Sequence, residues 1–322
     1  MTQTEYFDEL ETRDPEVRDG AQFNALAEQL EHAKAKAPAL AEHLARVDPA
    51  AVRSRAALAR LPLLRRKDLI ERQRRPVEDR NPFGGLTAIK TKRLAHIFAA
   101  SGPLYSPAAM RPDYGRIARA LFAAGFRRGS IVHNSFSYHL TPTGAVFEAG
   151  AHALGCPVVP AGTDNAELQV RTIVDVKPAC YMGPPAFLKH LLDTARTMKA
   201  EIGIARALVS GDALSDVQRK DFTTRGVEAR QCYATDEIGL IAYESQPGEG
   251  LILDEWVIVE IVKPGTGDPV PEGETGEVVV TTLNPDYPLI RFATGDLSAF
   301  LPGASACGRT GRRLKGLLGR TD

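Results

Sequence analysis

The sequence lacks three features: an excess of charge of either sign, a long apolar run and a signal segment. Forty basic residues balance forty acidic ones among 322 residues, so nothing attracts the chain to nucleic acid or to an anionic membrane. No apolar run approaches the roughly 20 residues that span a bilayer. The acidic N-terminal segment has neither the basic start nor the apolar middle of a signal peptide. We therefore expect a cytoplasmic protein with no nucleic-acid partner and no membrane partner.

Closely spaced metal ligands are also lacking. The four cysteines, at 156, 180, 232 and 307, form no close pair, which excludes zinc-knuckle and redox spacings. The seven histidines are scattered along the chain, with no pair at helical spacing. A structural metal is therefore not expected.

What the sequence does contain is a regular alternation of short apolar strands and amphipathic helices, from about residue 111 to residue 245. This alternation predicts a parallel α/β sheet with helices on both faces. Before it, residues 1–90 form a helical region with a break at Pro38. After it, residues 246–322 are β-like, with a hairpin-like stretch between the first two strands. The predicted organisation is thus a helical region (1–90), an α/β body (91–245) and a β-rich subdomain (246–322).

Ligands of parallel α/β sheets bind beyond the carboxyl ends of the strands. Two segments at such ends carry chemically useful residues. In "CYATDE", Tyr233 precedes Thr235, Asp236 and Glu237, an order that suits a stacked base, a phosphate and a bound Mg²⁺. The alternative is a solvated acidic loop after a core tyrosine.

The second segment, Ser210–Asp212, follows another predicted strand and precedes a helix. Its backbone groups can line the edge of a ligand, or it can be a tight turn with a capping side chain.

A third stretch lies in the β-rich region. In "YPLIRFATGDLSAF" we expect a strand that ends in Ala-Thr-Gly-Asp, with Thr294 and Gly295 forming a turn that holds Asp296 at its rim. A carboxylate there can accept hydrogen bonds from two vicinal hydroxyls, as on a ribose. It can equally be a turn aspartate that binds its own backbone.

The order of these stretches resembles one protein family. "SGDALS", "CYATDE", "GETGEVVVTTL", "YPLIRFATGDL" and "RRLKGLLGRTD" follow one another as in the adenylate-forming (AMP-binding) superfamily, within its phenylacetate–coenzyme A ligase-like group. The resemblance covers the chain from about residue 90 to its end. It implies an ATP-dependent, AMP-forming acid–coenzyme A ligase that uses Mg²⁺ and acts through an acyl-adenylate.

The resemblance also implies roles for individual residues. Asp296 is similar to the ribose ligand, Tyr233 to the aromatic residue on adenine, and Glu237 to the Mg²⁺-associated carboxylate. Residues that resemble further nucleotide contacts are Ser101, Gly102, Ser210, Gly211, Asp212, Arg312 (or Arg309) and Arg320. Residues that fall where the family builds its acid pocket are Tyr138, His139, Gly183 and Pro184. The arginines can instead be a solvated basic tail, and His139 an isolated imidazole.

The chain departs from the family's pattern at three places. "SGPLYSP" stands where the family has Ser-Ser-Gly-Thr-Thr-Gly-Lys-Pro, so Ser101 and Gly102 remain but Pro103 and Leu104 offer no donor side chain. Asp236 stands where a Ser or Thr usually faces the α-phosphate, and Thr235 is the nearest hydroxyl. The family's small C-terminal domain is expected after Asp322 and does not follow in this sequence.

These features leave several functions to compare. The first is the ligase, with a small and aromatic carboxylic acid as substrate and, as in related ligases, a homodimer. The second is a non-catalytic relative that binds nucleotide or acyl-adenylate and works through a partner. The third is a nicotinamide oxidoreductase. This sequence disfavours it, because it lacks the Gly-x-Gly-x-x-Gly turn that such an enzyme needs.

Overall fold

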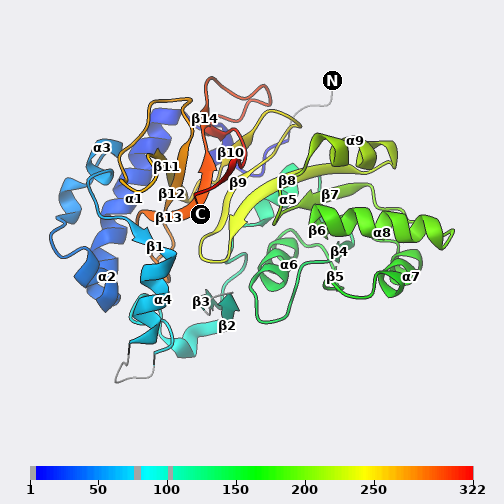
Figure 1. Cartoon of the computed structure of the whole chain (residues 1–322), viewed down its shortest axis with the longest axis horizontal. Helices are drawn as coiled ribbons and strands as arrows, with labels where there is room; N and C mark the ends of the chain where they lie inside the picture. The colour runs from blue at the N-terminus through cyan, green and yellow to red at the C-terminus, as the bar shows by residue number, and fades with distance from the viewer. Residues whose placement is uncertain (1–4, 76–80, 101–103, 322) are drawn as a thin grey trace. The chain divides into compact units, whose positions relative to one another are not determined.

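The computed structural model describes residues 5–75, 81–100 and 104–321. The chain divides into two compact units (Figure 1). The first contains the residues up to Phe7 together with Arg111–Leu251, and the second contains Asp8–Met110 together with Ile252 onward. The N-terminal helices and the β-rich segment therefore belong to one unit, and the α/β segment forms the other.

The first unit is built on the predicted parallel sheet. Its strands follow the order β9-β8-β7-β6-β4-β5, in which β4 to β8 run parallel and β9 is antiparallel to β8. The strands are β4 (Val132–Asn134), β5 (Val158–Pro160), β6 (Cys180–Gly183), β7 (Arg206–Val209), β8 (Glu228–Thr235) and β9 (Gly239–Tyr243).

Amphipathic helices alternate with these strands, as the sequence predicts. They are α5 (Ala118–Ala123), α6 (Thr143–Ala153), α7 (Ala166–Val176), α8 (Pro185–Thr197) and α9 (Asp216–Thr224). Their apolar stripes explain the packing, because Ile173 of α7, Leu188 of α8 and Phe222 of α9 share one buried cluster with strand residues. Asn165 caps α7 by accepting from the amide of Leu168 at 3.1 Å.

One helix is shorter than the sequence predicts. The helical pattern over 112–129 becomes only α5, because Asp113 and Arg116 have positive φ values of 45° and 62°. The Asp113 carboxylate accepts from the amides of Ile117 and Ala118 at 2.7 and 3.1 Å. Its side chain thus satisfies the first free amides of the helix and sets the point at which α5 begins.

The second unit begins with helices. They are η1 (Glu9–Thr12), α1 (Pro15–Lys36), α2 (Pro38–His43), η2 (Pro49–Ala51), α3 (Arg55–Leu58), α4 (Arg66–Arg74) and η3 (Thr91–Arg93). The predicted break at Pro38 is confirmed. Leu26 and Leu30 of α1 are fully buried and pack in one cluster with Ile258 and Ile290, which come from the β-rich part of the same unit. In the described ranges, no helix is long and apolar enough to cross a membrane.

Most strands of the second unit form one main sheet and one hairpin, while β14, β15 and β10 are paired in that order outside both. In the main sheet the order is β1-β13-β12-β11, with β16 also paired to β13, and the hairpin is β2-β3. The strands are β1 (Leu64–Arg65), β2 (Leu94–Ala100), β3 (Leu104–Ala109), β10 (Leu251–Leu253), β11 (Val257–Val262), β12 (Gly276–Thr282), β13 (Phe292–Ser298), β14 (Phe300–Leu301), β15 (Arg313–Leu314) and β16 (Gly319–Arg320).

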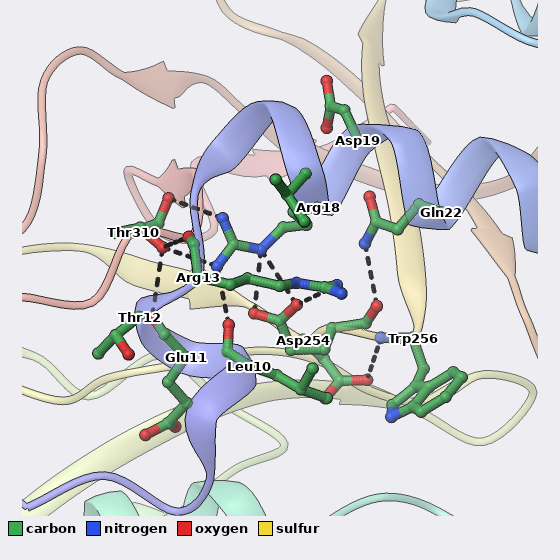
Figure 2. A network of polar contacts seen from close by, with 12 residues as sticks. Leu10, Glu11, Thr12, Arg13, Arg18, Asp19, Gln22, Asp254, Trp256 and Thr310 are labelled. Carbon is green, nitrogen blue, oxygen red and sulfur yellow. Dashed lines mark hydrogen bonds and ion pairs between the residues drawn. The ribbon is translucent and has the colours of Figure 1, made fainter.

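Helix α1 is tied to this unit by a buried polar network (Figure 2). The Glu255 carboxylate accepts from Arg13 at 2.7 Å and from Arg18 at 3.0 Å. Arg18 also donates to the hydroxyl of Thr310 at 2.8 Å, and Gln22 donates to the carbonyl of Glu255 at 2.9 Å. The N-terminal helix is thus joined to two segments that lie far from it in the sequence.

The predicted strand ending at Ala-Thr-Gly-Asp is wrong in its position. β13 begins at Phe292 and runs through Asp296, while most of the apolar stretch before it is not a strand. The buried Arg291 explains this, since its guanidinium pairs with Glu260 at 3.0 Å and donates to the carbonyl of Gly267 at 2.7 Å. Side-chain contacts of Arg291 hold this stretch in place of a strand ladder.

Candidate functional site

Two of the predicted segments meet at the carboxyl edge of the parallel sheet. β7 and β8 are neighbours, with Val209 opposite Gln231, so the residues that follow β7 lie beside the last turn of β8. The hydroxyl of Ser210 donates to the carbonyl of Cys232 at 3.0 Å. This bond joins Ser210–Asp212 to the strand that delivers Tyr233, which is the arrangement expected of a ligand-binding edge.

The turn after β7 needs a glycine. Gly211 has a φ of +95°, which side chains rarely tolerate, and an added Cβ would meet no heavy atom within 4 Å. Space is therefore open beside this backbone. Ser210 is buried, whereas Gly211 and Asp212 are exposed.

The segment after β8 combines buried and half-buried groups. Tyr233 and Glu237 are only 4% and 8% exposed, and Asp236 is half-buried. The hydroxyl of Thr235 accepts from the amide of Ile238 at 3.2 Å, so it stabilises the turn that carries the two carboxylates. The alternative predicted from the sequence, a solvated acidic loop after a core tyrosine, agrees with the burial of Tyr233 but not with that of Glu237.

At the end of β4, a polar group that the sequence does not single out orients Tyr138. Asn134 is fully buried, and its Nδ2 donates to the Tyr138 oxygen at 2.6 Å and to the carbonyl of Gly144 at 2.9 Å. The Tyr138 hydroxyl in turn donates to Glu148 at 2.5 Å. Burial, followed by the contact with Glu148, raises the pKa of Tyr138, so the phenol stays neutral. His139 is exposed.

A second buried network lies beneath this edge. The Oε1 of Gln169 accepts from the hydroxyl of Ser135 at 3.0 Å and lies 2.8 Å from Nε2 of His133. Gln169 Oε1 can only accept, so the His133 proton is assigned to Nε2. Burial lowers the pKa of His133, which keeps the ring neutral. The only sequence signal for this network is that polar residues follow the apolar start of a strand.

Gly183, at the end of β6, is required by close packing. An added Cβ would lie 2.2 Å from the Tyr181 hydroxyl oxygen. That hydroxyl donates to the carbonyl of Pro184 at 3.2 Å, so the tyrosine closes the strand end. The predicted pocket residues Tyr138, Gly183 and Pro184 thus all lie at carboxyl ends of neighbouring strands β4 and β6.

In the second unit, two predicted residues are brought together on the β13–β16 ladder. Asp296 lies opposite Arg320, whose guanidinium contacts its carboxylate at 3.1 Å. Thr294 to Asp296 form an irregular stretch opposite Val278 of β12, in which Gly295 has a φ of +80°. Asp296 therefore lies in a bulge inside a strand, and it is buried, with 8% of the residue exposed.

Of the other predicted nucleotide contacts, the two arginines interact with side chains of the protein, and the remaining two residues are not described by the structure. The Arg312 guanidinium stacks on Phe300, 3.6 Å from the ring centre, and lies 3.5 Å from Glu272. Arg309 pairs with Glu11 at 3.0 Å. Ser101 and Gly102 lie outside the described residues. Among the residues that the structure describes, no group of three or more His, Cys, Asp or Glu side chains could hold a metal ion.

Comparisons with known proteins agree with this arrangement. The family model "AMP-binding enzyme" matches residues 137–284. The chain is 32% identical over 295 residues to a phenylacetate-coenzyme A ligase of Thermus thermophilus, covering 86% of this chain and 64% of that protein. It is 30% identical over 293 residues to a phenylacetate-coenzyme A ligase of Aromatoleum evansii, with the same coverage of 86% and 64%. The chain thus spans less than two thirds of the length of these relatives.

A solved structure is similar over nearly the whole fold. An open conformation of 2-hydroxyisobutyryl-CoA ligase, in complex with 2-HIB-AMP and CoA, superposes with a TM-score of 0.88 at 25% identity, covering 96% of this chain and 71% of that one. The fold is the one that this solved structure has, and the AMP-binding family model matches the part of the chain that carries the strand-end segments. The chain belongs to the AMP-binding superfamily, in its phenylacetate–coenzyme A ligase-like group.

Proposed function

We propose that this chain carries the nucleotide- and acid-binding part of an ATP-dependent, AMP-forming acid–coenzyme A ligase. In the first step, a carboxylate oxygen of the acid attacks the α-phosphorus of ATP. The bond from that phosphorus to the bridging oxygen breaks, and pyrophosphate leaves. In the second step, the thiolate of coenzyme A attacks the acyl carbon and AMP leaves, taking the oxygen that joined acyl group and phosphate.

The observation that carries the proposal is the joined pair of strand ends at β7 and β8. The Ser210 hydroxyl holds the first segment against Cys232, one residue before Tyr233. We assign the edge of Ser210–Asp212 and the ring of Tyr233 to the adenine base. Asp296 is assigned to the ribose hydroxyls, since a carboxylate has two oxygens and can accept two hydrogen bonds. Arg320, its neighbour on the ladder, is assigned to nucleotide oxygens, as is Arg312.

Mg²⁺ fits the chemistry of the segment after β8. Mg²⁺ at a nucleotide is bound through one or two carboxylates plus the phosphates themselves, so no cage of protein ligands is needed. Glu237, only 8% exposed, would hold the ion, with Asp236 beside it. When bound, the ion supplies positive charge that offsets the charge of the phosphates. Thr235 contributes the nearest hydroxyl to the α-phosphate.

The acid is assigned to the strand ends of β4 and β6. Tyr138 is 37% exposed and can offer its aromatic ring to a substrate, and Gly183 and Pro184 lie at the end of the neighbouring strand β6. Hydrogen bonds with Asn134 and Glu148 hold the Tyr138 ring in place. A flat substrate would therefore pack against a fixed aromatic surface. We propose that the substrate is an aromatic acid of the phenylacetate class and that His139 lies at the entrance to its binding site. We also propose that the protein forms a homodimer.

A second candidate is a non-catalytic relative that binds nucleotide or acyl-adenylate. The observation that favours it is Asp236, a carboxylate at a position assigned to face the α-phosphate, where it repels negative charge unless metal compensates it.

One experiment separates the two candidates. Exchange of labelled pyrophosphate into ATP, with and without phenylacetate, measures adenylate formation by the chain, and AMP binding measures the site alone. Acid-dependent exchange supports the ligase. AMP binding without exchange supports the second candidate. Absence of both contradicts each of them.

A further inference from the structure

A small cavity lies within the second unit, beside the start of α1. Its volume is about 80 Å³, and all the residues that line it belong to this unit. Arg18, Asp19 and Thr310, which line it, are drawn in Figure 2. One buried water needs about 10–15 Å³, whereas pockets for larger organic ligands have about 300–1,000 Å³. The cavity therefore has room for a molecule of a few heavy atoms and excludes a nucleotide.

Part of the cavity wall is apolar. Leu253 at the end of β10, together with Val257 and Val259 of β11, lines the cavity, and all three residues are buried. An apolar wall stabilises a ligand only where the ligand has apolar surface to bury. This wall therefore favours a ligand with a short hydrocarbon part over an inorganic ion.

Arg18 contributes a polar part of the wall. Its Nε donates to the Glu255 carboxylate at 3.0 Å, its Nη1 to the carbonyl of Thr310 at 3.0 Å, and its Nη2 to the Thr310 hydroxyl and the Leu10 carbonyl at 2.8 and 3.0 Å. All three nitrogens of this guanidinium are thus engaged within the protein. Arg18 shapes the cavity, and we do not assign a ligand to it.

Arg55 and Arg312 are the other two guanidinium groups that line the cavity. Arg55 donates to Asp19 through Nη2 at 2.8 Å and Nε at 3.3 Å, so its Nη1 takes no part in that pair. Arg312 stacks on Phe300 and lies 3.5 Å from Glu272, which is longer than a charge-assisted hydrogen bond. Both groups can therefore still donate to an anion.

The charges at the cavity favour one added negative charge. Four guanidinium groups lie at or beside it against three carboxylates, namely Arg13, Arg18, Arg55 and Arg312 against Asp19, Asp254 and Glu255. Glu272 is 63% exposed, so water screens its charge. Burial lowers the pKa of Arg312, and the positive charge of Arg55 lowers it further. An anion bound by both guanidinium groups would offset this repulsion.

We propose that this cavity binds a short monocarboxylate, such as acetate or propionate. Its carboxylate accepts from Arg55 and Arg312, and its hydrocarbon end packs against the apolar wall. The strand ends assigned to the acid substrate belong to the other unit, so this site is a second one and does not depend on the proposed function. Arg312 is also assigned above to nucleotide oxygens, whereas Arg55 is not, so Arg55 distinguishes the two roles.

The experiment is titration of the chain with propionate, followed by saturation-transfer NMR. Saturation of the propionate methyl group reports contact with the apolar wall. Arg55→Met and Arg312→Met should each raise the dissociation constant of propionate at least tenfold, since each removes a charge-assisted hydrogen bond. Arg55→Lys keeps the charge without the planar fork, so its dissociation constant should lie between those of wild type and Arg55→Met.

The variants and comparison ligands separate binding from folding. The side chains of Arg55 and Arg312 are 33% and 38% exposed, so we expect both variants to fold, and thermal unfolding checks this. The matched control is Arg225→Met, which removes a guanidinium paired with Asp193 at 2.8 Å in the other unit. Inorganic phosphate is added as a competitor, and AMP affinity is measured for wild type and Arg55→Met.

Propionate binding that is weakened by the Arg55 and Arg312 variants and not by the control, with AMP affinity unchanged in Arg55→Met, supports the proposal. Absence of propionate binding by wild type, or equal affinity in all variants, overturns it. Stronger binding of phosphate than of propionate also overturns it, because the apolar wall would then not select the ligand. A matching loss of AMP and propionate in Arg55→Met overturns it as well. Failure of wild type to bind AMP contradicts the proposed function and leaves this inference standing.

Discussion

The buried network around Glu255 gives a quantitative prediction. Its carboxylate is 4% exposed and pairs with two guanidinium groups, Arg13 and Arg18, whose side chains are 19% and 8% exposed. Glu255→Gln removes the charge that compensates both. Breaking a buried ion pair by removing one partner costs about 3–5 kcal/mol. Because the new amide oxygen can still accept one bond and Arg13 reaches solvent, we expect about 3 kcal/mol.

The partners should not contribute equally. Arg18 also donates to Thr310 and to the carbonyl of Leu10, so Arg18→Met should cost about 3 kcal/mol, whereas the partly exposed Arg13→Met should cost about 1 kcal/mol. The double variant Arg18→Met with Glu255→Leu should cost less than the sum of its single changes, since it leaves fewer buried charges unpaired.

The assay is urea unfolding followed by fluorescence. The chain has one tryptophan, Trp256, which is 48% exposed and adjoins Glu255. Its emission therefore reports on the second unit. A cost below about 1 kcal/mol for Glu255→Gln, or equal costs for the two arginine variants, would refute the reasoning, because buried uncompensated charge could not then be the cause.

Further predictions concern packing and pH. Gly183→Ala should destabilise the first unit by about 1–3 kcal/mol, because its Cβ would lie 2.2 Å from the Tyr181 oxygen. Gly203→Ala, with no heavy atom within 4 Å, is its control in thermal unfolding, and equal effects would count against the packing argument. The lowered pKa of His133 means that the unfolded chain binds more protons than the folded one below the ordinary pKa of 6.5. The free energy of unfolding should therefore fall as pH falls through 6.5, by at most about 1.4 kcal/mol per pH unit, with a shallower slope in His133→Gln; an unchanged slope would assign the titration to another group.

Local patterns in the sequence predicted much of the first unit. Short apolar runs that alternate with amphipathic stretches located its strands and helices. The strand ends then indicated Ser210–Asp212 and Tyr233–Glu237 as site segments. These two segments lie side by side because β7 and β8 are parallel neighbours in the sheet. Such signals depend on residues that are close in the chain.

Contacts between distant residues could not be predicted in this way. The carboxylate that holds Arg18 is 237 residues away, and Gln73 reaches Tyr105 across 32 residues. Asn134 and Gln169 are ordinary polar residues in the sequence, and only the fold gives them buried partners. The predicted bounds of the strand before Asp296 were wrong, because Arg291, a charged residue that is 2% exposed, makes side-chain bonds just before β13 begins.

The central claim, an adenine nucleotide site, is tested most directly by calorimetric titration of the wild-type chain and Asp296→Ala with AMP. Arg320→Ala, followed by thermal unfolding alone, is the control for the lost pair with Asp296, since Arg320 is 58% exposed and the pair contributes at most about 1 kcal/mol to stability. The account predicts AMP binding by wild type and a loss of about tenfold or more in Asp296→Ala, without a matching loss of thermal stability. Equal AMP affinity in wild type and Asp296→Ala, or no AMP binding by wild type, would contradict it.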